Sequence, residues 1–334
     1  MRALVLTGYG GPENTELRDV EPPRAGAGDV TVRVHAAGLN PLDYKIREGQ
    51  LRAIRRFPLP IVMGNELAGV VEAVGAGVTR VAVGDRVYAR VDKDTLGAFA
   101  EIACVPEGAV AKMPSKLDFE QAATVPLAAL TALQALRDEL HAASGQRIFI
   151  PGGAGGVGTF AIQIAKRLGA KVATTASERG DALVRRLGAD VVIDYTKARF
   201  EDELRDYDGA FDLMGAETLK GCFGIVKRGG RVVSIAGMPE PRTAADMGKG
   251  AGMATLFWFA SMGLRLRAWQ RGVDYRYLFM HPSGPELDEI GAWIDAGELE
   301  VVVDRVFPFD EAKEALAYLE KGRAKGKVVL RVAK

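Results

Sequence analysis

The sequence predicts an α/β protein of two domains, a small β-barrel-type domain and a domain built on a doubly wound parallel sheet. The first third of the chain alternates short β-rich runs with Gly and Pro, which is typical of an irregular β domain. After residue 119, apolar strands alternate with helical patterns, which is typical of a parallel sheet with helices on both faces. A chain of 334 residues is long enough for two cores, because single cores stop growing near roughly 250–300 residues.

The expected elements follow this division. In the first part, β-rich runs predict strands at residues 3–6, 30–36, 66–74, 85–89, 97–105 and 110–112. In the second part, Ala and Leu at helical spacing predict a helix within residues 120–140. The alternating pattern then predicts strands at 147–150, 171–175, 191–194, 209–213 and 231–235 and helices at 158–168 and 181–187. The tail adds helices at 286–295 and 310–321 and strands at 301–307 and 327–332.

Composition excludes some classes of function. Lys and Arg number 44 against 43 Asp and Glu, so we expect no nucleic acid partner and no bulk attraction to an anionic membrane. The two cysteines, Cys104 and Cys222, are too few for a disulfide framework or a Cys-rich zinc site, which favours a reducing, cytoplasmic setting. No basic region with a following apolar run precedes the first strand, so we expect no targeting signal.

The strongest motif is a glycine cluster between the strand at 147–150 and the helix after it. Gly153, Gly155 and Gly158 have the G-x-G-x-x-G spacing, and Gly156 and Val157 stand between them. Such glycines allow a tight turn, close approach of the backbone to a pyrophosphate and close helix packing, while the helix N-terminus offers free N–H groups. Because strand, glycines, helix and second strand occur in the right order, we expect dinucleotide binding rather than a purely structural turn.

The end of the second strand predicts which dinucleotide is bound. An Asp or Glu there binds the ribose 2′-OH of NAD, whereas a small or basic residue accepts the 2′-phosphate of NADP. Ser177 stands at the expected position and Arg179 can supply positive charge, so the sequence favours NADP (NADPH). A shift of one residue would instead place Glu178 at the ribose, and Arg179 would then be an ordinary solvated charge.

The ordered motifs resemble those of the medium-chain dehydrogenase/reductase superfamily, and within it the zinc-free quinone oxidoreductases (zeta-crystallin-like) and the enone oxidoreductases. Besides the glycine loop, the resemblance rests on residues 38–45, 64–71, 83–88, 97–101, 122–127, 130–134, 187–190 and 193–195. It implies a GroES-like catalytic domain, residues 1–122 and 273–334. It also implies a Rossmann NADP-binding domain, residues 123–272, with an apolar insertion at about 245–271. We expect a homodimer.

Zinc members of this family differ at decisive positions. Asn40 stands where they carry a Cys, and Asn65 stands where they carry the His of a Gly-His-Glu sequence. The three His residues of the chain are far apart in sequence, so we expect no metal site. Without a Lewis acid, hydride addition to a quinone or an α,β-unsaturated carbonyl is favoured over alcohol oxidation, because the negative charge is then delocalised.

The resemblance implies that residues 40–45 line the cleft at the substrate. Lys45 then orients the nicotinamide ribose or polarises the carbonyl, with a surface lysine on a turn as the plainer alternative. Asn40 is a candidate donor to a substrate oxygen, although an Asn before Pro equally caps a turn. Tyr44 is a candidate proton donor, with an aromatic wall as the simpler interpretation.

Other residues are candidates for cofactor binding. By resemblance, Thr131 lies beside the nicotinamide and Tyr195 near the 2′-phosphate, with an ordinary helix threonine and a strand-end tyrosine as the alternatives. Arg323 and Lys327 resemble the family's closing Gly-Lys element, whose basic groups are available to phosphate, and for Arg323 a solvated basic turn is the alternative. Two turns at carboxyl ends of strands, where open α/β sheets bind ligands, complete the set: Met214-Gly215 and Ala236-Gly237.

The chain departs from the compact family core between residues 237 and 286. An apolar run at 252–262 is followed by Arg265, Arg267 and Arg271. The run is too short for a membrane span, which needs about 20 residues. Two interpretations remain: a helix that packs on the substrate cleft or a dimer partner, or an amphipathic helix at 252–271 that makes peripheral contact with a bilayer.

These observations lead to one leading hypothesis and two alternatives. The leading hypothesis is an NADPH-dependent, zinc-independent oxidoreductase that acts on a small quinone or enone. One alternative is a non-catalytic NADPH-binding protein of the zeta-crystallin type, and another is a zinc-free alcohol or aldehyde reductase. The intact glycine loop and the retained Lys45 favour the enzyme.

Overall fold

The computed structural model describes residues 1–92 and 95–333, and these form two compact units. The first unit comprises Met1–Leu130 and Pro282–Lys334, and the second comprises Thr131–His281. The chain therefore leaves the first unit once and returns to it near its end. The boundaries expected from the sequence, after residues 122 and 272, lie earlier along the chain than these divisions.

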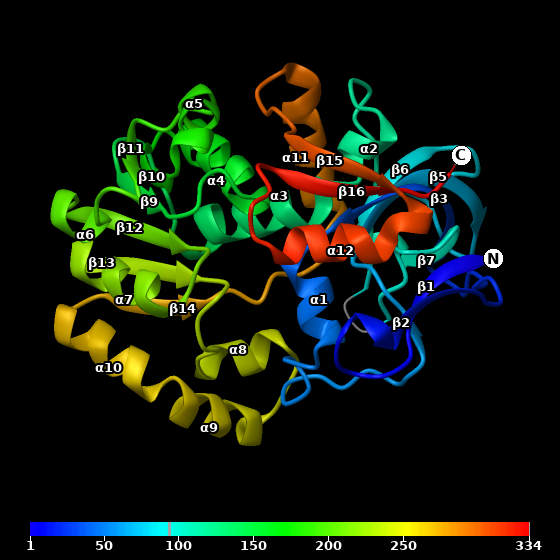
Figure 1. The fold of residues 1–334 in the computed structure, drawn as a ribbon, viewed down its shortest axis with the longest axis horizontal. Helices are drawn as coiled ribbons and strands as arrows, with labels where there is room; N and C mark the ends of the chain where they lie inside the picture. Colours follow the sequence, from blue (N-terminus) through cyan, green and yellow to red (C-terminus); the bar gives the residue numbers. More distant parts are fainter. Residues whose placement is uncertain (93–94, 334) are drawn as a thin grey trace. The chain divides into compact units, whose positions relative to one another are not determined.

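The first unit contains two sheets (Figure 1). Three antiparallel strands form the smaller sheet in the order β2 (Thr15–Asp19), β1 (Arg2–Leu6), β4 (Ile61–Val62). The larger sheet has the order β15-β16-β3-β5-β6-β8, and β7 pairs with β3. Its strands are β3 (Asp29–Leu39), β5 (Glu66–Val74), β6 (Arg86–Arg90), β7 (Ile102–Pro106), β8 (Val110–Lys112), β15 (Val303–Pro308) and β16 (Lys327–Arg331). Apolar side chains from these strands and from the segment before β7 meet in a core that includes Leu4, Leu67, Phe99 and Leu330.

Short helices connect these strands. The α-helices wholly within the first unit are α1 (Pro41–Arg47), α2 (Phe119–Ala122), α11 (Gly284–Ala296) and α12 (Ala312–Glu320). Short 3₁₀ helices occur at Pro12–Asn14, Glu107–Ala109 and Phe309–Glu311. The sequence did not predict α1, although Pro41 at its first position is typical of a helix start. It also missed β2, which is mostly polar, and β4, which is two residues long.

The second unit is a parallel six-stranded sheet in the order β11-β10-β9-β12-β13-β14, which is the order of a Rossmann fold. Its strands are β9 (Arg147–Ile150), β10 (Lys171–Ala176), β11 (Val191–Asp194), β12 (Tyr207–Asp212), β13 (Val226–Ser234) and β14 (Asp274–Tyr277). Its main helices are α4 (Gly156–Arg167), α5 (Glu178–Arg186), α6 (Phe200–Glu203) and α7 (Ala216–Ile225). From β9 the chain continues to β10 and β11 on one side of the sheet and later to β12, β13 and β14 on the other side. Because such crossovers are right-handed, α4 and α5 lie on one face of the sheet and α7 lies on the other (Figure 1).

The segment at residues 120–140 is helical, as its spacing predicts, but the structure divides it. Helix α2 ends at Ala122, α3 covers Pro126–Leu133, and a π-helix follows at Gln134–Glu139. Pro126 explains the first division, since proline has no N–H to donate to the preceding turn. The apolar spacing of the segment is continuous, so periodicity alone did not reveal the break.

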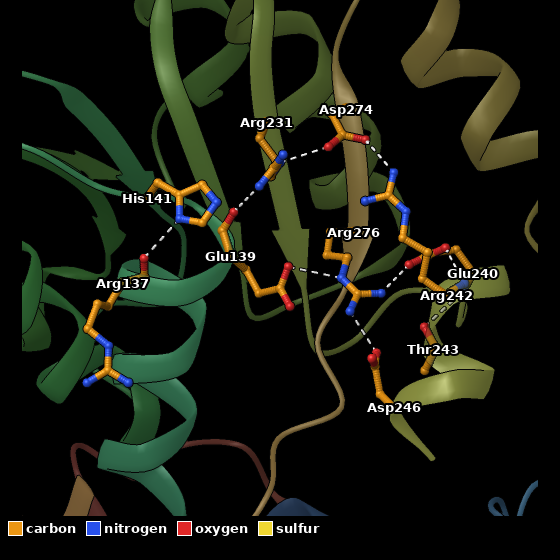
Figure 2. Close-up of polar contacts among 10 residues, drawn as sticks. All are labelled: Arg137, Glu139, His141, Arg231, Glu240, Arg242, Thr243, Asp246, Asp274 and Arg276. Carbon is orange, nitrogen blue, oxygen red and sulfur yellow. Dashed lines mark hydrogen bonds and ion pairs between the residues drawn. The ribbon is translucent and has the colours of Figure 1, made fainter. Parts of the chain in front are cut away.

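The apolar insertion forms three helices, α8 (Pro241–Asp246), α9 (Ala251–Ala260) and α10 (Met262–Arg271). A charged cluster holds α8 to the end of the sheet (Figure 2). Arg276 of β14 donates to Glu139 Oε2 at 3.0 Å and to Asp246 Oδ2 at 2.7 Å, and it also contacts Glu240. Within residues 1–92 and 95–333, no helix has the length and apolar character needed to cross a membrane.

Candidate functional site

The glycine loop between β9 and α4 is packed so closely that two of its glycines have no room for a side chain. A Cβ atom on Gly153 would lie 2.2 Å from Thr174 Oγ1, and one on Gly158 would lie 2.5 Å from the carbonyl oxygen of Gly152. A Cβ on Gly155 would lie 3.3 Å from that same oxygen, which is tight but far less severe. Gly158 therefore lets the first turn of α4 approach the loop, as the motif predicts.

Hydroxyl groups of β10 hold this loop in place. The N–H of Gly152 donates to Thr175 Oγ1 at 3.0 Å, and the N–H of Gly153 donates to Thr174 Oγ1 at 3.1 Å. The glycine motif alone does not reveal the role of these threonines, although two adjacent hydroxyls in a mostly apolar strand are a visible signal.

The N-terminus of α4 provides donors for an anion. The N-cap, Gly155, makes no side-chain capping bond, and the N–H groups of Gly156, Val157 and Gly158 have no acceptor within the helix. Three outward N–H groups at the positive end of the helix dipole suit a phosphate. The loop is thus a preformed cradle with the chemistry of a pyrophosphate site.

Candidate residues for the 2′-phosphate lie at the carboxyl ends of β10 and β11. Strands β10 and β11 pair Ala176 with Asp194 at their ends, so Ser177 and Tyr195 are the first residues after two neighbouring strands. Ser177 is half-buried at the N-cap of α5, Arg179 is exposed in the first turn, and Tyr195 is 59% exposed.

Asp212 and Ser234 fix the two turns at the ends of β12 and β13. Ser234 Oγ donates to Asp212 Oδ2 at 2.6 Å, and Asp212 accepts the N–H groups of Met214 and Gly215. Ser234 Oγ accepts the N–H groups of Ala236, at 3.1 Å, and Gly237, at 2.8 Å. Burial raises the pKa of Asp212 above its ordinary value, although these bonds oppose the shift.

The sequence indicated these turns but not the Asp212–Ser234 pair that supports them. Gly215 has a φ of +72°, and a Cβ on it would lie 2.5 Å from the carbonyl oxygen of Ala236. Met214 lies beside the glycine loop, because its Sδ is 3.0 Å from the position of a Cβ on Gly152. The structure therefore places the Met214 turn next to the phosphate cradle.

In the first unit, α1 begins inside a buried polar network. The N–H of Asn40 donates to Asp43 Oδ2 at 2.7 Å, and Asn65 Nδ2 donates to Asp43 Oδ1 at 2.6 Å. Asn40 Nδ2 donates to Glu66 Oε1 at 2.8 Å. All four side chains are almost fully buried.

Lys327 closes this network with a buried ammonium group. Its Nζ donates to Glu66 Oε1 at 2.6 Å, to Asn40 Oδ1 at 2.5 Å and to the carbonyl oxygen of Leu39 at 3.0 Å. Lys327 is 3% exposed and Glu66 is fully buried. The other carboxylate oxygen of Glu66 accepts the N–H of Leu127 at 2.7 Å. An ammonium group has three protons, so these contacts leave Lys327 none for a phosphate.

The remaining candidates differ in accessibility. Tyr44 and Lys45 are half-buried on α1, Arg323 is exposed after α12, and Thr131 is buried in α3. Burial, followed by the charges of Glu320 and Glu48, raises the pKa of Tyr44 above its ordinary value. A half-buried position with a polar tip is compatible with contact to a ligand for both Tyr44 and Lys45.

The buried carboxyl group of Asp43 is expected to make the stability of the first unit depend on pH. Burial raises the pKa of Asp43 to about 6, and the bonds from Asn65 and Asn40 oppose the shift. Between about pH 4 and pH 6 the folded chain holds a proton that the unfolded chain has lost, so stability from this group falls as pH rises through 6. The Asp43→Asn variant should lack this loss, which is on the order of 2–3 kcal/mol.

Urea unfolding of the wild type and of Asp43→Asn, measured from pH 4.5 to 7.5, tests this expectation. The difference in unfolding free energy between the two proteins should change with pH. As pH rises, the unfolding free energy of the wild type should fall relative to that of Asp43→Asn. Parallel curves across this range would contradict a titrating Asp43.

Two family models match the chain. One described as "Alcohol dehydrogenase GroES-like domain" matches residues 26–115, and one described as "Zinc-binding dehydrogenase" matches residues 187–330. The chain is 35% identical to "NAD(P)H oxidoreductase RTN4IP1, mitochondrial" of Danio rerio over 91% of this chain and 84% of that protein. It is 36% identical to the chloroplastic "NADPH-dependent alkenal/one oxidoreductase" of Arabidopsis thaliana over 99% of this chain and 79% of that protein.

A solved structure agrees with these matches. The quinone oxidoreductase of Coxiella burnetii is 30% identical and superposes with a TM-score of 0.86, covering 100% of this chain and 99% of the other. The expected GroES-like domain and Rossmann domain are thereby confirmed. The chain belongs to the medium-chain dehydrogenase/reductase superfamily, in its group of quinone and enone oxidoreductases.

Proposed function

We propose that the protein is an NADPH-dependent, zinc-independent oxidoreductase that transfers hydride to a quinone or an α,β-unsaturated carbonyl. The observation that carries this proposal is the glycine loop, in which Gly153 and Gly158 have no room for a Cβ and the helix N-terminus behind them presents free N–H groups. The names of the Arabidopsis and Coxiella relatives support the acceptor class.

The residues of the second unit fit a nicotinamide dinucleotide. Gly156, Val157 and Gly158 would hold the pyrophosphate through their N–H groups, and Ser177, Arg179 and Tyr195 would hold the 2′-phosphate. The Met214-Gly215 and Ala236-Gly237 turns would line the path of the cofactor, and Thr131 would lie at the nicotinamide. The cofactor supplies the hydride, while the protein orients the reactants and excludes water.

The side chains of α1 have separate proposed roles. Lys45 and Tyr44 contact the ligand, with Lys45 orienting the ribose or polarising the carbonyl. Asn40 has a different role from the donor first expected, because its amide is engaged by Glu66 and Lys327. We therefore assign Asn40 and Lys327 to positioning α1, and Arg323 stays the exposed basic candidate for phosphate.

Zinc independence is supported by donor chemistry. A catalytic zinc site needs three protein ligands that include thiolate, imidazole or carboxylate groups. Here Asn40 and Asn65 supply amides, and the two carboxylates beside them are already engaged. Asp43 accepts the Asn40 N–H and the Asn65 amide, and Glu66 neutralises the Lys327 ammonium. A second cation at Glu66 would be repelled by this ammonium, whose Nζ lies 2.6 Å from Glu66 Oε1, so the residues do not fit the metal that the name of the second family model suggests.

Arg179→Ala is expected to raise the Michaelis constant for NADPH about tenfold and to leave that for NADH nearly unchanged. The reason is that a charge-assisted bond to a 2′-phosphate contributes about 1.5–3 kcal/mol to binding. Because Arg179 is exposed, its bond contributes less than the upper part of this range. Steady-state kinetics with both cofactors measure the change.

Glu178→Gln is the matched control, because Glu178 is an exposed neighbour in the same turn. It should leave the preference for NADPH unchanged. A loss of NADH use in Glu178→Gln, with no effect of Arg179→Ala, would instead assign the ribose to Glu178 and NAD to the protein.

The proposed reaction is tested by mixing the protein with NADPH and following absorbance loss with 1,4-benzoquinone, 9,10-phenanthrenequinone and 3-buten-2-one. Turnover with at least one of these acceptors, retained after chelation, is expected. Tight NADPH binding without turnover would favour the non-catalytic alternative. If a simple aldehyde were reduced in the same assay while none of these three acceptors was, an aldehyde reductase would be favoured. The homodimer and the cytoplasmic location expected from the sequence stay predictions.

A further inference from the structure

Helices α9 and α10 form one nearly continuous rod. The N–H of Ser261 donates to the carbonyl of Phe257 at 2.9 Å, and the N–H of Arg265 donates to the carbonyl of Ser261 at 2.9 Å. Helical hydrogen bonding thus passes through the junction between the two helices. At about 1.5 Å per residue, the rod from Ala251 to Arg271 is roughly 30 Å long.

The rod buries one side and exposes large apolar residues on the other. Phe257, Ser261 and Ala268 are buried, and α10 packs against α7 and β14. On the opposite side, large apolar residues are spaced three or four positions apart, so they share one helix face, which we name the apolar stripe. Their exposed fractions are 53% for Leu256, 63% for Phe259, 49% for Met262, 53% for Leu266 and 75% for Trp269. Monomeric proteins rarely leave so much contiguous apolar surface without a partner.

Positive charge surrounds the apolar stripe. Residues 247–273 include no Asp or Glu but four basic residues: Lys249, Arg265, Arg267 and Arg271. Helical spacing puts Arg267 and Arg271 on one side of the stripe and Arg265 on the other. Glu217 of α7 is the acid that faces Arg267, and it is paired with Lys220. The whole chain is nearly neutral, so this local excess is a property of the segment.

The acids that flank the segment are already engaged. Asp246 at the end of α8 pairs with Arg276 at 2.7 Å, and Asp274 at the start of β14 pairs with Arg231 at 2.8 Å (Figure 2). These pairs also tie both ends of the insertion to the sheet. The rod is therefore a fixed, basic and apolar surface of the second unit.

We propose that the apolar stripe docks on an anionic lipid surface, with Phe259, Leu266 and Trp269 entering the boundary between headgroups and acyl chains. Amphipathic helices with aromatic and Leu residues on one face and arginines beside it bind such surfaces. The arginines would keep their charges at the headgroups while their stems follow the apolar side. This inference does not depend on the reaction proposed above.

Charge complementarity favours lipid over a second copy of the chain. In a symmetric dimer the same patch meets itself, so Arg265, Arg267 and Arg271 would approach their own counterparts. An anionic bilayer instead supplies opposite charge along the whole rod. The stripe thus fits a partner that is both apolar and negative.

Flotation with vesicles of phosphatidylcholine and phosphatidylglycerol in a three-to-one ratio tests the proposal. The full-length protein should float with these vesicles, should float poorly with pure phosphatidylcholine, and should be released by high salt. Leu266→Ser/Trp269→Ser should abolish flotation. Arg267→Glu/Arg271→Glu should weaken binding by at least about tenfold, since each basic residue near an anionic surface contributes about 1 kcal/mol.

Matched controls lie on the first unit. Val83→Ser removes another exposed apolar residue, and Arg56→Glu/Lys313→Glu reverses two exposed basic charges there. Both should float as the wild type does. Equal flotation of every variant, or none for the wild type, would overturn the proposal, and so would self-association in sedimentation velocity that Leu266→Ser/Trp269→Ser abolishes without any vesicle binding.

Tryptophan emission supplies an independent readout. Two of the three tryptophans, Trp258 and Trp269, lie in the rod, and Trp293→Phe removes the third. In this variant, anionic vesicles should shift the emission to shorter wavelength, and brominated lipid should quench it. Unchanged emission with saturating vesicles would also contradict insertion of the stripe.

Discussion

Gly158→Ala is expected to weaken NADPH binding by about 10- to 100-fold, because overpacking by one methyl group costs about 1–3 kcal/mol. The new Cβ would lie 2.5 Å from the carbonyl oxygen of Gly152 and 2.7 Å from the Cα of Gly153. Both atoms belong to the backbone, so no side-chain rotation relieves the contact. The first turn of α4 must then move away from the loop, and its N–H groups move with it. Titration of protein with NADPH, followed by cofactor fluorescence, measures the affinity.

Gly155→Ala is the matched control in the same motif. Gly155 has a φ of −81°, which any residue adopts, and its Cβ would lie 3.3 Å from the Gly152 oxygen. We expect it to weaken NADPH binding several-fold less than Gly158→Ala. Equal losses would mean that the backbone approach to the ligand, rather than the packing of helix on loop, limits both positions.

The sequence predicted five of the six strands of the second unit's sheet, because these are mostly apolar runs with glycines close to them. It missed β14, whose residues Asp274–Tyr277 are charged or aromatic. Strands at 147–150 and 191–194 agree with β9 and β11 at every residue. Prediction was weaker where a continuous apolar spacing runs through more than one helix, as it does in residues 120–140. It missed α1, whose seven residues mix a proline with apolar, aromatic and charged side chains.

The candidate site was predicted in its backbone parts and less well in its buried polar parts. The glycine spacing identified the phosphate cradle, because φ freedom and close approach demand glycine at fixed positions. Lys327 shows the limit of such inference. It lies 261 residues from Glu66 in sequence, and only the pairing of β16 with β3 brings the two together. A basic residue after Gly326 gives no sign of whether its charge meets a phosphate or a buried carboxylate.

Lys327→Met is expected to lower the free energy of unfolding by about 3–5 kcal/mol, since removing one partner of a buried ion pair leaves the other charge uncompensated. Glu66 is fully buried, and Lys327 is the cation that bonds its Oε1. The same change removes the bond from Nζ to Asn40 Oδ1, so the start of α1 also loses support. Urea unfolding at neutral pH, followed by circular dichroism, measures the loss.

The double variant Lys327→Met/Glu66→Gln separates charge compensation from simple packing. Glutamine removes the buried negative charge and keeps an oxygen that accepts the Asn40 amide, so the double variant should regain at least about 2 kcal/mol relative to Lys327→Met alone. Lys321→Met, at an exposed lysine, should change stability by less than about 0.5 kcal/mol. If the double variant were as unstable as Lys327→Met, the loss would come from the missing contacts of Lys327 to Asn40 and Leu39, and Glu66 would not need this ammonium for its charge.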